Sequence, residues 1–215
     1  MEYKAKTRYQ DKNIAEAYDA ARFDRLKGRL VGHREISLIK KGIAHFGLPA
    51  PLDILDLPCG TGRLTVSLAA AGHQVTGVDI SAMMIGQAKK KLDQEHPLPI
   101  KFFVGDAETL DFPDGLFDLA VCLRLFGHLP PGNRRRVLKE LTRVSKKGVV
   151  VAYYQRFTLQ NLLRARQRSQ AETGWYPTTL RQITDEMNGA DLVPMGRSYL
   201  LPFVSETLVV SARKA

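Results

Sequence analysis

Apolar residues along the chain form two kinds of pattern: short continuous runs, and segments in which they recur every three or four positions. The continuous runs are typical of buried strands, and they predict strands at 52–57, 74–80, 100–104, 117–123 and 148–154. The helical periodicity predicts helices at 12–46, 63–71, 82–93, 131–144, 156–172, and from Thr178 or Thr179 to Met187. Two closing strands are expected at 193–201 and 207–212.

Strands that alternate with helical stretches of about 10–15 residues indicate βαβ units and a parallel sheet. Only a short connection around Pro202 separates the last two strands, which favours an antiparallel pair. The predicted fold class is therefore α/β: a Rossmann-like, doubly wound, mostly parallel sheet with an antiparallel C-terminal strand and an N-terminal helical extension.

Composition adds limits to this picture. The 215 residues are 44% hydrophobic and 25% charged, which is close to the average for soluble globular chains and excludes disordered, collagen-like and coiled-coil classes. Cys59 and Cys122 lie in apolar runs and make no disulfide framework or zinc pattern, so we expect a reducing, cytoplasmic location. The N-terminus has no apolar signal region, and no apolar run approaches about 18 residues, so no transmembrane segment is expected.

Candidate chemistry lies where the predicted strands end, because ligands of open α/β sheets bind beyond the carboxyl ends of the strands. The first strand leads through Asp56 into Gly60-Thr61-Gly62, where two glycines allow a tight turn and close approach to a ligand. Asp79 follows Asp56 by 23 residues, near the spacing at which an acid meets a ribose diol. Asp106 ends the third strand, where it could orient an adenine amino group.

The same residues have plainer interpretations. Asp79 could cap a helix, Asp106 could serve turn chemistry, and Asp56 could orient the glycine turn. Thr65 occupies the third position of the dinucleotide pattern G-x-G-x-x-G, so that pattern is incomplete.

Several segments together resemble the motifs of the class I S-adenosylmethionine-dependent methyltransferase family. ILDLPCGTG at 54–62 resembles the first motif and VTGVDIS at 75–81 the second. VGDAETLDFPDGLFDLAVC at 104–122 is similar to the third and fourth, and LTRVSKKGVVVAYY at 141–154 resembles the step R-V-L-K-P-G-G. The likeness covers about residues 50–155 and the closing strand pair. Departures at Pro58, Cys59 and 145–148 leave the two glycines in place.

The resemblance implies S-adenosylmethionine as cofactor and a role for each matching residue. Gly60 and Gly62 would pass beneath its methionine end, and Asp79 would take the ribose hydroxyls. Tyr18 and Arg22 would close over the cofactor from the N-terminal helix. The implied cofactor contacts are Tyr18, Arg22, Asp56, Gly60, Gly62, Asp79, Ile80, Asp106, Ala107, Leu123 and Arg124. The implied organisation is one domain over 1–215: a helical lid at 1–48, a cofactor-binding core at 50–155, a substrate-side insert at 156–177, and a closing helix and strand pair at 178–215.

Methyl transfer needs a general base only if the acceptor keeps its proton, and His128 is the candidate base. Tyr153, Tyr154 and Arg156 are candidate substrate residues. The insert carries Arg156, Arg164, Arg166 and Arg168 against the single acid Glu172, which predicts recognition of a carboxylate or phosphate; a solvated helix face is the alternative. No metal site is expected.

The predicted activity is therefore methyl transfer by in-line displacement to O or N of a small, anionic acceptor. An RNA-directed methyltransferase and a dinucleotide-dependent oxidoreductase are the alternatives. The net charge of +10 admits a nucleic-acid partner but does not favour one, because the lysine and arginine runs at 89–91, 134–136 and 146–147 are expected on outer helices as solubilising faces. The sequence does not indicate an oligomeric state.

Overall fold

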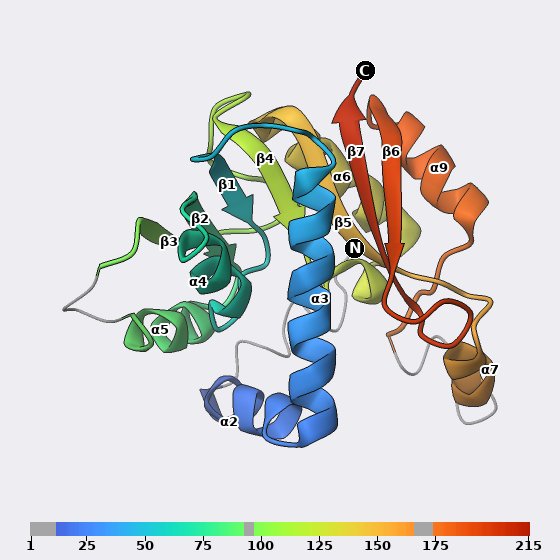
Figure 1. Cartoon of the computed structure of the whole chain (residues 1–215), viewed down its shortest axis with the longest axis horizontal. Helices are drawn as coiled ribbons and strands as arrows, with labels where there is room; N and C mark the ends of the chain where they lie inside the picture. The colour runs from blue at the N-terminus through green and yellow to red at the C-terminus, as the bar shows by residue number, and fades with distance from the viewer. Residues whose placement is uncertain (1–11, 93–96, 166–173) are drawn as a thin grey trace.

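A seven-stranded sheet with the strand order β3-β2-β1-β4-β5-β7-β6 forms the centre of the protein. The computed structural model describes residues 12–92, 97–165 and 174–215 (Figure 1). β1 to β5 pair in parallel, and β7 pairs antiparallel with both β5 and β6, which confirms the predicted fold class. The strands are β1 (Asp53–Asp56), β2 (Gln74–Asp79), β3 (Ile100–Val104), β4 (Phe117–Cys122), β5 (Ser145–Tyr154), β6 (Leu192–Tyr199) and β7 (Thr207–Lys214).

Helices cover both faces of this sheet (Figure 1). Successive residues of the central strands point to opposite faces, so Leu55 and Val151 join one buried cluster while Ile54 and Val150 join the other. The first cluster includes α6 and α9, and the second includes α3 and α4. The helices are α2 (Lys12–Phe23), α3 (Leu26–Ala44), α4 (Arg63–Ala69), α5 (Ala82–Lys90), the 3-10 turn η1 (Phe126–His128), α6 (Pro131–Val144), α7 (Leu159–Ala165) and α9 (Leu180–Asn188).

Local signals mark several element boundaries. Ser81 caps α5, because its side chain accepts a hydrogen bond from the backbone N–H of Met84 at 3.2 Å. Thr179 caps α9 through a capping box with Gln182, whose side chain accepts from the backbone N–H of Thr179 at 2.9 Å. β3 and α6 have the predicted bounds.

The helical segment predicted over 12–46 is two helices rather than one. The chain breaks at Asp24 and Arg25, between α2 and α3, and turns so tightly that a Cβ on Gly28 would lie 2.1 Å from the carbonyl oxygen of Arg22. Only glycine permits that approach. As a result, α2 leaves the line of α3 and extends along the edge of the sheet (Figure 1).

Most other boundaries differ from the prediction by one to three residues. β5 begins at Ser145, directly after α6, rather than at residue 148. The insert helix predicted over 156–172 begins at Leu159 and is described as far as Ala165; Arg166, Arg168 and Glu172 lie outside the described residues, as does the side chain of Arg164. Among the described helices, none has both the length and the apolar character that crossing a bilayer requires.

Candidate functional site

A pocket of about 780 Å³, partly open to solvent, lies at the carboxyl edge of the parallel strands, against α2 and α3. This position is where open α/β sheets bind ligands. The structure brings together there the predicted residues Tyr18, Arg22, Asp56, Gly60, Asp79, Leu123, Arg124 and His128.

The glycine turn after β1 forms the floor of this pocket. Gly62 is the N-cap of α4 with φ +78°, and a Cβ at this residue would lie 3.1 Å from the Ala88 side chain and 3.2 Å from that of Phe102. Both the conformation and the close packing therefore require glycine. The backbone N–H of Cys59 donates to the carbonyl of Val78 at 2.9 Å, which holds the turn to β2.

The carboxylate of Asp79 is fixed by two backbone donors. Its Oδ2 accepts from the N–H of Gly60 and its Oδ1 from the N–H of Ser81, each at 2.9 Å. Burial raises the pKa of Asp79, while the two hydrogen bonds oppose this effect. Each oxygen retains a lone pair, because a carboxylate has about four acceptor positions. Asp79 can therefore accept hydrogen bonds from a ligand while it remains anchored.

Asp56 is fully buried, and only one of its two carboxylate oxygens has a hydrogen-bond partner among the described residues. Its Oδ2 accepts a hydrogen bond from the hydroxyl of Thr65 at 2.6 Å, whereas its Oδ1 has no hydrogen-bond partner among the described residues. Burial raises the pKa of this carboxyl from its ordinary 3.8 to about 7. A buried polar atom without a partner is costly, so Oδ1 is an acceptor suited to a ligand donor.

Arg124 lines the same pocket, and its guanidinium also has a nitrogen without a hydrogen-bond partner among the described residues. It follows β4 with φ +65°. Its Nε donates to Glu35 Oε2 at 2.8 Å, and its Nη2 contacts the same oxygen. Its buried Nη1 has no acceptor in the described part of the chain. The guanidinium lies 4.9 Å from the ring centroid of Phe23, with Arg63 at 3.5 Å from that ring. Glu35 and Phe23 thus hold Arg124 with one donor left for an anion.

Helix α2 is fastened over the glycine turn by Asp19. The hydroxyl of Thr61 donates to Asp19 Oδ1 at 2.8 Å. Lys91 pairs with the other oxygen of Asp19 and donates to the carbonyl of Thr61 at 3.0 Å. The same helix carries Tyr18 and Arg22 into the pocket lining, so α2 forms one side of the pocket.

Aromatic rings form a wall behind His128, which itself lines the pocket. The ring of Trp175 lies edge-on to His128 with 5.0 Å between centroids, and at 4.6 Å from Tyr154. The backbone N–H of Tyr176 donates to the carbonyl of Gly127 at 2.7 Å, which holds the segment carrying Trp175 against η1.

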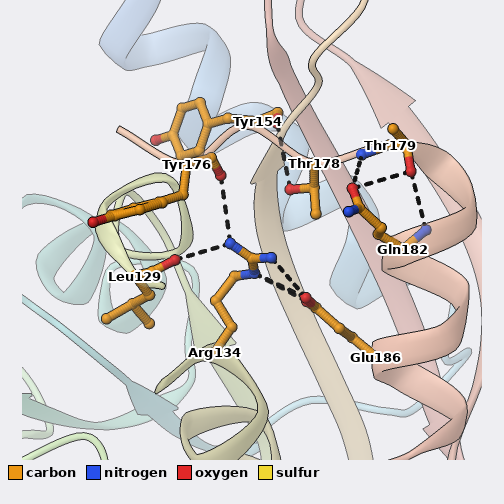
Figure 2. Close-up of polar contacts among 8 residues, drawn as sticks. All are labelled: Leu129, Arg134, Tyr154, Tyr176, Thr178, Thr179, Gln182 and Glu186. Carbon is orange, nitrogen blue, oxygen red and sulfur yellow. Dashed lines mark hydrogen bonds and ion pairs between the residues drawn. The ribbon is translucent and has the colours of Figure 1, made fainter. Parts of the chain in front are cut away.

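A buried ion pair joins α6 to α9, as Figure 2 shows. The guanidinium of Arg134 binds Glu186 of α9, at 2.7 Å for the shortest contact, and donates to the carbonyl of Leu129 at 2.8 Å. It also reaches the carbonyl of Tyr176 at 3.5 Å. Three segments distant in sequence therefore share one buried charge.

Seven predicted residues lie outside the pocket lining: Gly62, Ile80, Asp106, Ala107, Tyr153, Tyr154 and Arg156. Ile80, Asp106 and Ala107 lie near the ends of β2 and β3, along the same sheet edge. Asp106 Oδ1 accepts from the backbone N–H of Glu108 at 3.0 Å, so it does take part in turn chemistry. Gly62 shapes the turn as described above.

The prediction that Tyr153 lines an acceptor pocket is wrong. Its ring is fully buried in the core on the side of α6 and α9, 4.9 Å from that of Phe126. Neighbours on a strand face opposite ways, so only Tyr154 reaches the wall beside His128. Arg156 likewise does not line the pocket: its side chain is exposed.

Several residues of the site were not predicted. Glu35 could have been identified from the sequence, because it is an acidic residue on the apolar face of the helix that includes Ile39. Arg63 directly follows the glycine turn. Periodicity and motifs could not have indicated Phe23, Asp19 or Trp175. Only packing brings Phe23 into the pocket lining and places Asp19 and Trp175 against the lining residues Thr61 and His128.

Comparison with known proteins agrees with this geometry. A family model described as a methyltransferase domain matches residues 54–148. The phosphatidylethanolamine N-methyltransferase of Cereibacter sphaeroides is 33% identical over 160 residues, 70% of this chain and 77% of that protein. The chloroplastic magnesium protoporphyrin IX methyltransferase of Arabidopsis thaliana is 35% identical over 107 residues, 48% of this chain and 33% of that protein.

Several of the curated matches are partial, since the chain spans about a third to two fifths of the length of those relatives. At the level of fold, the structure of magnesium protoporphyrin IX methyltransferase from Synechocystis with bound S-adenosylmethionine has a TM-score of 0.73 at 20% identity, covering 98% of this chain and 97% of that one. The chain belongs to the class I S-adenosylmethionine-dependent methyltransferase family.

Proposed function

We propose that this chain transfers the methyl group of S-adenosylmethionine to N or O of a small acceptor. One observation carries the proposal: two buried atoms of opposite character line the same pocket without a partner in the described chain, Asp56 Oδ1 and Arg124 Nη1. Together they match a zwitterion, because the carboxylate can accept from an ammonium group and the guanidinium can donate to a carboxylate. The methionine end of S-adenosylmethionine carries both groups.

The rest of the cofactor would extend along the edge of the sheet. Asp79, anchored by Gly60 and Ser81, has lone pairs for the two ribose hydroxyls. Ile80, Asp106 and Ala107 would contact the adenine beyond it. This arrangement follows the general rule that ligands of doubly wound sheets lie across the strand ends.

When bound, the sulfonium supplies a methyl group that an acceptor lone pair can attack in line: the new bond forms as the carbon–sulfur bond breaks, leaving a neutral thioether. The protein therefore has mainly to position the reactants and exclude water. Tyr18 and Arg22 cover the pocket from α2, and Asp19 keeps that helix closed. His128 would take the proton when the acceptor must lose one.

For the acceptor we propose a small amphiphilic molecule. The names of two relatives specify phosphatidylethanolamine and magnesium protoporphyrin IX, which both combine apolar and polar parts. In this chain the aromatic wall of His128, Trp175 and Tyr154 would suit the apolar part. Arg22, exposed on the pocket rim, is the cation that would meet an anionic group.

Titration calorimetry with S-adenosylmethionine and S-adenosylhomocysteine tests the proposal. We expect saturable binding of both, and at least about tenfold weaker binding by Asp79→Asn, since a charge-assisted hydrogen bond contributes about 1.5–3 kcal/mol. Asp111→Asn is the matched control, because Asp111 is exposed and lies outside the pocket. Absence of binding, or equal effects of the two substitutions, would refute the proposal. Transfer of label from the cofactor into fractionated extracts would then identify the acceptor.

A further inference from the structure

Large apolar side chains project into solvent from two segments that are joined by hydrogen bonds. Phe157 is 79% exposed just before α7, and Phe203 is 86% exposed in the loop between β6 and β7. The backbone N–H of Leu159 donates to the carbonyl of Phe203 at 3.0 Å, and that of Gln160 to the carbonyl of Val204 at 3.1 Å. We call this surface the apolar ridge; its members are Phe157, Leu159, Leu162, Leu163, Leu201, Phe203 and Val204.

Phe203 is unfavourable for the free protein in two ways. Its side chain lies almost fully in water, and its backbone has φ +62°, a conformation that bulky residues rarely adopt and that glycine or asparagine would adopt more easily. Folding alone would favour replacement of this phenylalanine. An outlier of this kind is typical of a functional position.

The ridge lies at the same edge of the sheet as the pocket. β7 begins opposite the carboxyl end of β5, with Thr207 paired to Tyr154, so the loop that precedes β7 and the segment that follows β5 both lie at that edge. In Figure 1 they are near α7, at the lower right. The α2–α3 turn lies along the same lower edge of the view.

That turn is also both apolar and basic. Leu26 and Leu30 are 73% and 60% exposed, and Arg25, Lys27 and Arg29 beside them are exposed as well. We call residues 25–30 the basic corner. The pocket edge thus presents apolar side chains together with concentrated positive charge, on a chain whose net charge is +10.

We infer that this edge docks on the surface of an anionic lipid bilayer. Apolar side chains that enter the headgroup region beside basic residues are the combination that interfacial binding requires, and each basic residue near an anionic surface adds about 1 kcal/mol. A second copy of the chain is a poorer occupant, since it would bring a further basic corner to the same place. Docking would turn the pocket mouth toward the membrane. It does not depend on the proposed methyl transfer, so either can fail alone.

Sedimentation with vesicles tests the inference directly. We expect the full chain to bind vesicles of phosphatidylcholine with phosphatidylglycerol, and to bind those of phosphatidylcholine alone at least about tenfold more weakly. Added salt should weaken the binding, because it screens the basic corner. The double variant Arg25→Gln, Lys27→Gln should lose roughly twentyfold or more in affinity, at about fivefold for each charge.

The variant Phe157→Ser, Phe203→Gly tests the ridge. It should lose at least about tenfold in vesicle affinity, while unfolding in urea at the same or a higher concentration, since glycine relieves the backbone at 203. Binding of S-adenosylhomocysteine should be unchanged, which separates this test from that of the proposed function.

The matched control is Val193→Ser, Met195→Ser, which removes two exposed apolar residues of β6 away from the ridge. Wild-type affinity in this control supports the inference. Three results would each overturn it: absence of vesicle binding, an equal loss of affinity in the Phe157→Ser, Phe203→Gly variant and in this control, or a dimer in solution that dissociates on substitution of the two phenylalanines.

Discussion

Replacing Asp56 with asparagine should make the protein more stable at neutral pH although it alters the centre of the proposed cofactor site. The carboxyl is fully buried, and burial raises its pKa from 3.8 to about 7. Between these values the folded state binds more protons than the unfolded state, so stability falls as pH rises through this window. The asparagine side chain does not titrate, so the variant would not show this loss.

The size of the effect follows from the shift. A shift of about three pKa units corresponds to about 4 kcal/mol across the whole window, of which about 3 kcal/mol falls between about pH 5 and pH 8. For a chain of this length that is about 6–12 °C in Tm. The new amide group can still accept from Thr65, but its NH₂ faces the place where Oδ1 lacks a partner, which costs about 1–3 kcal/mol at every pH.

The assay therefore measures, as a function of pH, the difference in free energy of unfolding between the variant and the wild type. Urea unfolding of the wild type and of Asp56→Asn is measured at steps from about pH 5 to pH 8. The free energy of unfolding of the variant should increase relative to that of the wild type up to about pH 7, and the difference should then stay constant. Asp111→Asn, which changes an exposed carboxyl outside the pocket, is the matched control. A pH-independent difference for Asp56→Asn would refute the reasoning about burial.

The affinity for the ligand should change with pH in the opposite direction to the stability of the wild type. An ammonium group requires the ionised carboxyl, so wild-type affinity for S-adenosylmethionine should weaken as pH falls below about 7. Binding at neutral pH should release a proton, which calorimetry in buffers of different ionisation enthalpy detects. Asp56→Asn should bind at least about tenfold more weakly and release none. Tight binding by the wild type without proton release would contradict the proposal that Asp56 accepts a hydrogen bond from the ammonium group.

Three further outcomes follow from the contacts of single residues. Glu186→Gln should lower the free energy of unfolding in urea by about 3–5 kcal/mol, because it leaves a buried arginine without its counter-charge. The control Asp185→Asn, in an exposed pair at 4.0 Å, should lower it by at most about 1 kcal/mol. Equal losses would show that the buried pair does not stabilise the fold. Asp19→Asn should speed dissociation of S-adenosylhomocysteine about two- to tenfold in stopped flow, and an unchanged rate would mean that the α2 contact does not retain the ligand. Gly62→Ala should destabilise the fold by at least about 1 kcal/mol, because the residue has φ +78° and little free space, while Gly86→Ala in α5, where a Cβ meets nothing, should stabilise it by about 0.5–1 kcal/mol; the same sign for both would refute the argument.

Features that depend on neighbouring residues could be predicted from the amino-acid sequence. Helical and strand periodicity placed β3 and α6. The start of α9 could be narrowed to Thr178 or Thr179, because a cap is made between residues three positions apart. The glycine turn and Asp79 could be placed at one sheet edge, since the carboxyl ends of parallel strands meet there.

The partners of those residues depend on how the whole chain packs. The break between α2 and α3 depends on a close approach at Gly28, and the facing of Tyr153 depends on which side of β5 meets α6. Phe23 lines the pocket, and Asp19 and Trp175 contact its lining residues Thr61 and His128, through packing across long stretches of chain. The unpaired atoms of Asp56 and Arg124 became visible for the same reason: whether a polar atom lacks a partner depends on every segment packed around it, and no local pattern records that.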